Sequence, residues 1–347
     1  MKKKILHLLA MNCFSGAENV VCQLIGMFSE NDEVEMIYCS PDGPIRKALE
    51  ERGVVYEPLI NLSVREVRRV IKKQKPDLIH AHDVRACLVA SVCNGRIPIV
   101  SHMHNNWKEM RRVSIKSCLY LMSSFRYQTI IWVSQSAYEQ YFFKKILKMK
   151  SLVLPNIINI SETKNRARLS SVDKVYDVVY VGRLSYQKNP ERLVSVLERI
   201  VKEKSDVSVG IVGDGDLAEK IAQMIRNKEL IRNVDLLGFI ANPLPIVKNA
   251  SAFIMTSRWE GTPMSVLESL ALGTPVVCTP VDGLQDIIKP GINGVLSDND
   301  EVLASSVVKL IKDKDFYNRL SIGSIEFSRE YNSVENYRNL LSKIYKL

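Results

Sequence analysis

Two acidic side chains, Glu260 and Glu268, stand in one segment with seven residues between them. The segment, residues 258–277, reads RWEGTPMSVLESLALGTPVV and follows a run that is typical of a buried strand. Because carboxylates accept hydrogen bonds from sugar hydroxyls, the pair favours a polyhydroxylated ligand. The same pair would suit the acid and the nucleophile of a glycoside hydrolase, but that reaction needs no cations to hold a diphosphate.

The same segment predicts a helix N-terminus beside the first of these glutamates. Thr262 is a typical N-cap and Pro263 a typical first helical residue, which leaves the backbone amides of Met264 and Ser265 free to donate. Free amides at a helix N-terminus bind phosphate, and the helix dipole adds to the attraction. Amide donors next to Glu260 therefore predict a site for a phosphorylated sugar.

Two cations follow an earlier strand, in the segment VGRLSYQKNPERLVSVLERI, residues 181–200. The loop after the strand carries Arg183 and Lys188, and Asn189 and Pro190 predict the start of the next helix. Both cations are then expected near the carboxyl end of the strand. There they would neutralise a diphosphate leaving group, although a surface Arg and Lys would give the same pattern.

The first half of the chain holds further candidates at the ends of predicted strands. Gly16 opens a helix after the first strand, where a glycine permits close approach to a ligand or simply makes a turn. Two histidine pairs, His80 with His82 and His102 with His104, end two later strands. No obvious third ligand accompanies them, so we expect hydrogen bonding and no metal site.

These residues need parallel sheets to bring them together, and the chain predicts two. Short runs of β-branched residues alternate with amphipathic stretches throughout, which is typical of parallel sheets covered by helices. The expected strands cover residues 4–10, 33–39, 54–59, 76–82, 97–104, 129–134 and 151–155, and then 176–182, 207–213, 234–239, 250–256, 274–279 and 294–297. A polar stretch at 161–174 is expected to link two doubly wound α/β domains, with the ligand in a cleft between them.

The expected division places one domain at 1–165 and a second at 170–320. The last stretch, 321–347, is expected to be helical and to cross back to the first domain, because a longer stretch from 316 to 345 carries enough apolar side chains to pack on either domain.

Composition excludes several classes of protein. With 46% hydrophobic and 25% charged residues over 347 positions, the chain is neither disordered nor fibrous. Its apolar runs are far shorter than the roughly 20 residues that cross a bilayer. Seven scattered cysteines without a C-x-x-C pair favour a reducing, cytoplasmic compartment.

The net charge of +10 is concentrated in the first half of the chain. Residues 60–150 hold 17 basic and 5 acidic side chains, which favours an anionic partner as much as a plain solvated face. Residues 138–150 predict an amphipathic helix with a lysine-rich side, which suits a membrane surface as well as it suits a core helix with a solvated lysine face. Its expected apolar face consists of Tyr138, Tyr141, Phe142, Ile146 and Met149.

Two other functions fit the residues less well. The segment GDGDLA, 213–218, fits a dinucleotide-binding fingerprint with Asp235 about 20 residues further on, but its strand is the second of its domain and no hydride-transfer site accompanies it. A nucleic-acid-binding protein would explain the basic half and would leave the glutamates and cations without a role.

Taken together, the motifs resemble those of the retaining GT-B glycosyltransferases of family 4. The resemblance covers nearly the whole chain and is specific for the family, not for the substrate. Its motifs are SGAE (15–18), HAH (80–82), VS (133–134), LPN (154–156), GRL (182–184) with Lys188, GDGDL (213–217), LGF (237–239), the two glutamates, GTPVV (273–277) and GING (291–294).

The resemblance implies a nucleotide-sugar donor in the second domain and an acceptor in the first. Arg183 and Lys188 would hold the diphosphate, Glu268 the ribose hydroxyls, and the Phe239–Ile240 backbone the base. The implied catalytic residues are Glu260, His104, Arg183 and Lys188. The implied donor-binding residues are Gly16, Arg183, Lys188, Phe239, Ile240, Glu260, Gly261, Thr262, Pro263, Met264, Ser265 and Glu268.

The reaction that the resemblance implies is transfer of a hexose or N-acetylhexosamine, with retention and without a metal or other cofactor. The expected donor is a UDP-sugar, and the expected acceptor is a glycan or a lipid-diphosphate-linked saccharide in bacterial capsule or O-antigen synthesis, on the inner face of the cell membrane. A nucleotide-sugar epimerase on the same plan is the alternative. The family's N-G-V-D and Lys-Gly patterns read N-I-I-N at 156–159 and Lys188–Asn189, which leaves the acceptor side less defined.

Overall fold

A computed structural model describes residues 2–93, 95–104, 107–169 and 174–347. The chain forms two compact units, one of Met1–Ile157 with Val334–Leu347 and one of Ile158–Ser333. The boundary therefore falls before the expected 165, and of the expected terminal stretch 321–347 only the part from Val334 onward belongs to the first unit. The return of the C-terminal helix to the first unit is as expected.

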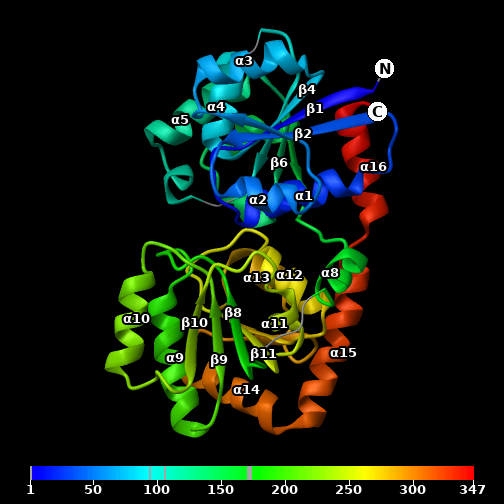
Figure 1. Cartoon of the computed structure of the whole chain (residues 1–347). Coiled ribbons are helices and arrows are strands. Elements are labelled where there is room, and N and C mark those ends of the chain that lie inside the picture. The colour runs from blue at the N-terminus through cyan, green and yellow to red at the C-terminus, as the bar shows by residue number, and fades with distance from the viewer. Residues whose placement is uncertain (1, 94, 105–106, 170–173) are drawn as a thin grey trace. The chain divides into compact units, whose positions relative to one another are not determined.

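The first unit is built on a seven-stranded parallel sheet in the order β3-β2-β1-β4-β5-β6-β7 (Figure 1). Its strands are β1 (Lys3–Leu8), β2 (Val34–Pro41), β3 (Tyr56–Leu59), β4 (Leu78–His82), β5 (Ile99–Met103), β6 (Tyr127–Trp132) and β7 (Ser151–Val153). The chain order reverses between the neighbours β1 and β4, and ligands bind at such a reversal in doubly wound folds.

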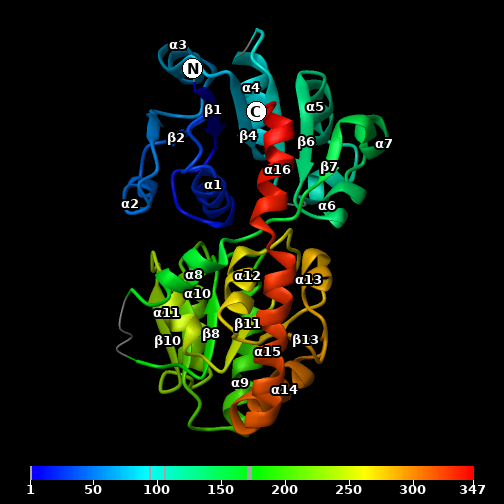
Figure 2. The same cartoon turned by 90° about the vertical axis from the view of Figure 1, so that its right-hand side faces the viewer.

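Helices cover both faces of this sheet. The helices are α1 (Gly16–Met27), α2 (Ile45–Glu50), α3 (Val64–Gln74), α4 (Asp83–Cys93), α5 (Ile115–Ser124), α6 (Gln135–Glu139), α7 (Lys144–Leu147) and α16 (Val334–Tyr345). One face packs against α3, α4 and α5, and the other lies under α1 and α16 (Figure 2). Tyr345 of α16 fixes that helix, because its hydroxyl lies 2.7 Å from Nδ1 of His80 on β4.

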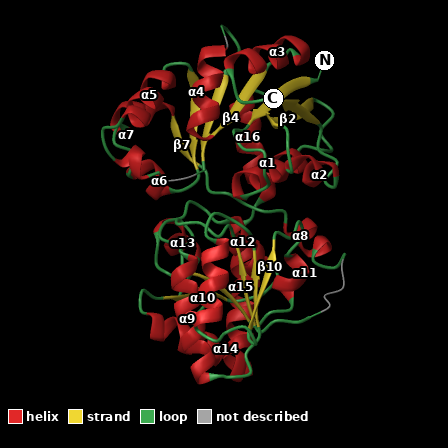
Figure 3. Cartoon of the chain, turned by 60° about the vertical axis from the view of Figure 1, so that its left-hand side comes forward, coloured by secondary structure: helices red, strands yellow, loops and turns green. Residues whose placement is uncertain are grey.

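The second unit repeats this plan with a six-stranded parallel sheet in the order β10-β9-β8-β11-β12-β13. Figure 3 shows helices packed around these strands. Its strands are β8 (Val178–Val181), β9 (Val209–Val212), β10 (Val234–Gly238), β11 (Ala252–Met255), β12 (Val276–Cys278) and β13 (Gly294–Leu296). The reversal of chain order lies between β8 and β11, which pair directly.

The helices of the second unit bury a contiguous apolar core. They are α8 (Ile160–Arg166), α9 (Pro190–Glu203), α10 (Ala218–Asn227), α11 (Leu244–Lys248), α12 (Met264–Ala271), α13 (Asp282–Ile287), α14 (Asp300–Lys312) and α15 (Lys314–Tyr331). Leu193, Val196, Leu197 and Ile200 of α9 are buried in it, as their spacing predicts.

All thirteen expected strands are present, and the fold class of two doubly wound parallel units is confirmed. Three local expectations were wrong. The expected helix over 138–150 is broken into α6, α7 and a 3₁₀ turn at Lys148–Lys150, because Tyr141 is buried in the core and pulls the chain inward. The expected linker 161–174 begins within α8, and its residues 170–173 lie outside the described part of the chain. The terminal stretch forms two helices, α15 and α16.

No helix in the described ranges is long and apolar enough to cross a bilayer.

Candidate active site

The loop with the predicted cations and the loop with the first predicted glutamate lie together at the carboxyl edge of the second unit's sheet. Lys188 lies in the loop after β8, and Glu260 in the loop after β11. Because β8 and β11 are neighbours in the sheet, these loops are adjacent although 72 residues separate the two side chains. Their position at the reversal of strand order is where a doubly wound domain binds its ligand.

Lys188 and Glu260 form a largely buried ion pair. The Lys188 Nζ lies 2.7 Å from Glu260 Oε1, with side-chain exposures of 18% and 5%. The Ser257 hydroxyl donates to the same carboxylate oxygen at 2.5 Å. Breaking a buried pair leaves an uncompensated charge, so this contact holds both loops in place. The ammonium group has three N–H donors, and the carboxylate takes one of them.

Main-chain contacts lock the two loops together around this pair. The Arg258 backbone N–H donates to the Gln187 carbonyl at 2.8 Å, and the Gln187 side chain donates to the Trp259 carbonyl at 3.1 Å. The Arg258 guanidinium lies over the Tyr186 ring at 4.0 Å, a cation–π contact. The loops thus pre-organise the ion pair.

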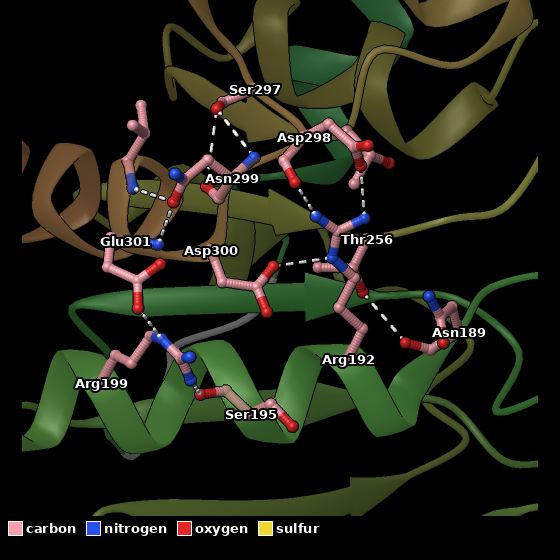
Figure 4. Close-up of polar contacts among 12 residues, drawn as sticks. Asn189, Arg192, Ser195, Arg199, Thr256, Ser297, Asp298, Asn299, Asp300 and Glu301 are labelled. Carbon is pink, nitrogen blue, oxygen red and sulfur yellow. Dashed lines mark hydrogen bonds and ion pairs between the residues drawn. The ribbon is translucent and has the colours of Figure 1, made fainter.

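A second network fixes the start of α9, next to Lys188 (Figure 4). Asn189 has a left-handed backbone with φ of 52°, and its carbonyl accepts a hydrogen bond from the Thr256 hydroxyl at the end of β11. One turn into α9, Arg192 pairs with Asp298 and Asp300, both at 2.7 Å. These contacts tie α9 to β11 and α14, so the Lys188 loop has a rigid base.

The helix after Glu260 starts one residue later than expected. Pro263, with extended backbone, is the residue before α12, and the helix begins at Met264. Pro263 therefore occupies the N-cap position that the sequence assigned to Thr262. Met264 and Ser265 still form the first helical turn, where amides lack partners within a helix.

Glu268 lies on α12 one turn after Met264, and it is buried. Helix α13 packs closely against the loop before α12. A Cβ at Gly283 of α13 would lie 1.6 Å from the Gly261 carbonyl oxygen of that loop. Only a glycine allows this approach, so α13 supports the segment that presents Glu260.

Arg183 is exposed directly after β8, and its side chain makes no ion pair or hydrogen bond with the described residues. Its backbone is fixed, because the buried Tyr180 hydroxyl donates to the Arg183 carbonyl at 3.2 Å. Burial, together with the nearby Glu260 carboxylate, raises the pKa of Tyr180, so this hydroxyl keeps its proton. Arg183 is thus a free cation on an ordered loop.

The dinucleotide interpretation of GDGDLA has no support in the geometry. A Cβ at Gly213 would lie 1.9 Å from the Gly182 carbonyl oxygen, so this glycine serves the packing of two loops. Asp235 is paired with Lys174 at 2.8 Å and accepts a hydrogen bond from Tyr176. The aspartate that would bind a ribose is therefore already engaged by its neighbours.

Phe239 and Ile240 follow β10 at the same edge of the sheet. Phe239 is 58% exposed, and Ile240 is partly exposed. An exposed aromatic ring at a carboxyl edge suits contact with a flat ligand group.

In the first unit, the candidates also lie beside the reversal of strand order. Gly16 begins α1 after β1, with open space around the position of a Cβ. His104 directly follows β5, and its backbone N–H donates to Asp83 at 3.1 Å. Burial raises the pKa of Asp83 to about 7 and lowers that of His104 to about 3, so His104 is neutral.

Three residues that support these sites were not predicted from the sequence. Ser257 binds Glu260, Gln187 binds the facing loop, and Asp83 anchors His104. The available signal was position, since Asp83 directly follows the strand run ending in HAH, and Ser257 stands just before RWEG. The expected roles of the named residues in donor binding and catalysis, and the absence of a metal, remain predictions.

Two doubly wound parallel units in one chain are the building blocks of the GT-B class of fold. Residues 14–162 match the family described as Glycosyltransferase Family 4, and residues 161–326 match Glycosyl transferases group 1. Together these matches cover most of the chain, which therefore belongs to the GT-B glycosyltransferases. The expected family is confirmed.

Relatives of nearly the same length are bacterial glycosyltransferases. The chain is 24% identical to the Escherichia coli UDP-Gal:alpha-D-GlcNAc-diphosphoundecaprenol alpha-1,3-galactosyltransferase, over 90% of this chain and 89% of that protein. It is also 24% identical to the Salmonella typhimurium lipopolysaccharide 1,6-galactosyltransferase, over 83% of both.

A solved structure supports the fold along the whole chain. Anabaena Alr3699/HepE, crystallised with UDP and glucose, superposes with a TM-score of 0.85 at 19% identity, covering 99% of each chain.

Proposed function

We propose that this glycosyltransferase moves a hexose or N-acetylhexosamine from a UDP-sugar, with retention, to a lipid-diphosphate-linked saccharide of the bacterial cell surface. The observation that carries the proposal is the Lys188–Glu260 pair at the carboxyl edge of the second sheet. Relatives that act on UDP-galactose and on a diphosphoundecaprenol acceptor, and a fold relative crystallised with UDP, support this choice of substrates.

The donor diphosphate is assigned to the two cations of the loop after β8. Lys188 keeps two N–H donors beyond its bond to Glu260, and the Arg183 guanidinium extends freely from an ordered backbone. Negative charge develops on the diphosphate as the sugar leaves, and fixed cations stabilise that charge. The first-turn amides of α12 add donors for the distal phosphate.

The sugar and the ribose are assigned to the two glutamates. Glu260, held by Lys188 and Ser257, accepts hydrogen bonds from sugar hydroxyls, and Glu268 accepts those of the ribose. The exposed Phe239 ring and the adjoining backbone are assigned to the base.

We assign transfer with retention and without a metal ion to the same set of groups. Because Lys188, Arg183 and the helix amides supply the positive charge, no divalent ion is needed on the diphosphate. The acceptor hydroxyl attacks the anomeric carbon on the same face from which the nucleoside diphosphate departs, and a phosphate oxygen of that leaving group accepts the hydroxyl proton. His104 and Gly16 of the first unit are assigned to the sugar and to the donor phosphates.

The acceptor's lipid is assigned to an exposed apolar surface of the first unit, the α5–α7 surface. It consists of Ile115, Leu119, Met122, Phe125, Phe142, Ile146 and Met149, which are 44% to 94% exposed. The two helices lie side by side (Figures 2 and 3), and the segments that precede them are linked, since the Phe142 N–H before α7 donates to the Met110 carbonyl before α5 at 2.9 Å.

Basic side chains are interspersed in sequence with these apolar residues: Arg111, Arg112, Lys116, Arg126, Lys144, Lys145 and Lys148. Exposed apolar side chains together with cations favour an anionic bilayer surface. We place the protein in the cytoplasm, peripherally on the inner face of the cell membrane. Of the apolar residues expected here, Tyr138 and Tyr141 pack in the core and take no part.

The donor assignment is tested by thermal shift with UDP, GDP and their sugars, followed by transfer to a synthetic diphosphate-linked acceptor. Specific binding raises the melting temperature. We expect UDP compounds to do so, and nuclear magnetic resonance of the product to show the donor's anomeric configuration. A flat response to every UDP and GDP compound would contradict the assignment. An activity lost in EDTA and restored by Mg²⁺ or Mn²⁺ would contradict metal independence.

A further inference from the structure

All five histidines of the chain gather on one face of the first unit's sheet, the face under α1 and α16. They are His7 on β1, His80 and His82 on β4, His102 on β5 and His104 just after it. The strand register sets His7 beside His80 and His82 beside His102. The rings stack, with centroids 4.4 Å apart for His80 and His82 and 4.2 Å for His102 and His104. The first four are at most 1% exposed, and His104 is 7% exposed.

Three of these rings form a continuous hydrogen-bonded chain. His7 Nδ1 lies 3.1 Å from His82 Nε2, and His82 Nδ1 lies 2.8 Å from His104 Nε2. At the two ends, His7 Nε2 and His104 Nδ1 are buried and have no partner among the described residues. The chain thus runs from the interior of the sheet to its carboxyl edge.

The rings in this chain are neutral. Burial lowers the pKa of His7 and His104 to about 3 and that of His82 well below its ordinary value. A relay that stores a proton on His7 is therefore excluded, because the cation would lie in the interior. What remains is a chain of neutral imidazoles, each with one N–H.

Neutral rings allow only two concerted arrangements. Either all three carry the proton on Nδ1, so that His7 donates to His82 and His82 to His104, or all three carry it on Nε2 and donate the other way. The second arrangement leaves an N–H of His7 orphaned in the interior, and orphaned buried N–H groups are rarer than orphaned acceptors. The first places the free N–H on His104 at the edge where a ligand arrives.

We propose that His7, His82 and His104 act as one tautomer-setting chain that holds His104 with its proton on Nδ1, as a donor to a hydroxyl or phosphate oxygen of the ligand. His7 and His82 are then positioning residues for His104, although 97 positions separate His7 from it in the sequence. The identity of that ligand rests on the proposed function, whereas the tautomers do not.

The same histidines also form two groups of three, His7/His80/His82 and His82/His102/His104, in which one ring nitrogen from each residue lies within 4.8 Å of the others. A metal there would take the nitrogens that now bond to one another. It would also place a divalent charge among rings with no carboxylate ligand in either group. We therefore favour the hydrogen-bonded chain and make metal an outcome of its test.

The test is ¹⁵N-histidine NMR on untagged, ligand-free protein, in which every histidine signal comes from this cluster. We expect neutral rings at pH 7 with Nδ1–H on His7, His82 and His104, assigned through single variants. Nε2–H on these three, mixed tautomers among them, cationic signals, or a stoichiometric transition metal in the purified protein would each overturn the proposal.

Variants separate this role from packing. His7→Phe keeps a ring and removes the donor, so we expect the His104 signal to shift partly to Nε2–H and kcat to fall about tenfold with little change in donor KM. His7→Asn, whose amide N–H replaces Nδ1–H, should restore both. His102→Phe is the matched control, since His102 is equally buried and has neither ring nitrogen in the chain.

Equal effects of His7→Phe and His102→Phe on the tautomers would contradict the proposal. If the tautomers are as expected and no sugar nucleotide supports transfer, the proposed function is contradicted and the proposal of a hydrogen-bonded histidine chain is retained.

Discussion

The carboxyl edges of the two sheets occupy the same topological position and use opposite electrostatics. The second unit places a charged pair there, with Lys188 and Glu260 2.7 Å apart and the free Arg183 close by in sequence. The first unit places neutral rings there, because burial lowers the pKa of His104 to about 3. The second unit's edge presents fixed charges to a ligand, and the first unit's edge presents a neutral hydrogen-bond donor to a hydroxyl or phosphate oxygen.

Under the proposed function, this difference divides the work of the transfer reaction between the two units. Fixed cations are required where negative charge develops on a leaving group. A neutral imidazole keeps a defined donor and adds no charge next to a diphosphate. The comparison yields predictions for each edge.

The largest effect is expected from acid on the first unit. His7 and His104 titrate near pH 3 in the folded state against 6.5 in the unfolded chain, and His80, His82 and His102 are lowered in the same direction. The unfolded chain therefore binds more protons below pH 6.5, and the free energy of unfolding falls as pH falls. The slope is up to about 1.4 kcal/mol per pH unit for each histidine.

Asp83 opposes this trend, since its raised folded pKa of about 7 makes stability fall as pH rises from about 4 to 7. One carboxyl against five imidazoles leaves a net acid sensitivity. Hydrogen exchange by peptide, corrected for intrinsic rates, should show the first unit opening between pH 6 and 4.5 before the second. Simultaneous opening, or none, would contradict the contrast between the edges.

Removing the lysine of the charged edge is expected to have the next largest effect. Lys188→Ala takes away transition-state charge stabilisation and should lower kcat/KM by about 10²–10³-fold. Lys202→Ala is the matched control, because Lys202 also pairs with a glutamate, Glu198, at 3.0 Å on the exposed side of α9. Equal activity of the two variants in a transfer assay would rule out the assignment.

Two glycine substitutions distinguish a glycine that is needed for packing from a glycine that is needed for approach of a ligand. Gly283→Ala forces a Cβ against the Gly261 carbonyl and should destabilise the protein by about 2–3 kcal/mol. Gly16→Ala meets open space and should change stability by less than about 0.5 kcal/mol. If Gly16→Ala still lowers donor affinity, a ligand approaches that backbone; unchanged affinity would remove Gly16 from the donor site. Urea unfolding and donor titration measure the two effects.

The smallest effect concerns the α5–α7 surface. Ile146→Glu should weaken partition onto anionic vesicles about tenfold, the equivalent of one buried aliphatic side chain. Ile231→Glu is the control, since Ile231 of the second unit is also 60% exposed. Sedimentation with phosphatidylglycerol vesicles at low salt measures both, and identical binding would remove this surface from the proposal.

The elements were predictable because their signals are local. Each strand is a short apolar run, and Asn189–Pro190 correctly marks the start of α9. Where tertiary contacts decide, the pattern misled: the burial of Tyr141 breaks the amphipathic stretch at 138–150, and Pro263 displaces Thr262 as the residue before α12.

The contacts that matter most for function are long-range. The sequence indicates Lys188 and Glu260 separately, and only the pairing of β8 with β11 joins them. The histidine pairs show a spacing of two, but the lone His7 gives no sign of bonding to His82 until β1 and β4 are adjacent.

Calorimetric titration of UDP and of uridine measures whether the Lys188–Glu260 edge binds the donor diphosphate. We expect Lys188→Ala to lose most of its affinity for UDP and to bind uridine as the wild-type protein does. Equal UDP affinity in both proteins would contradict this assignment.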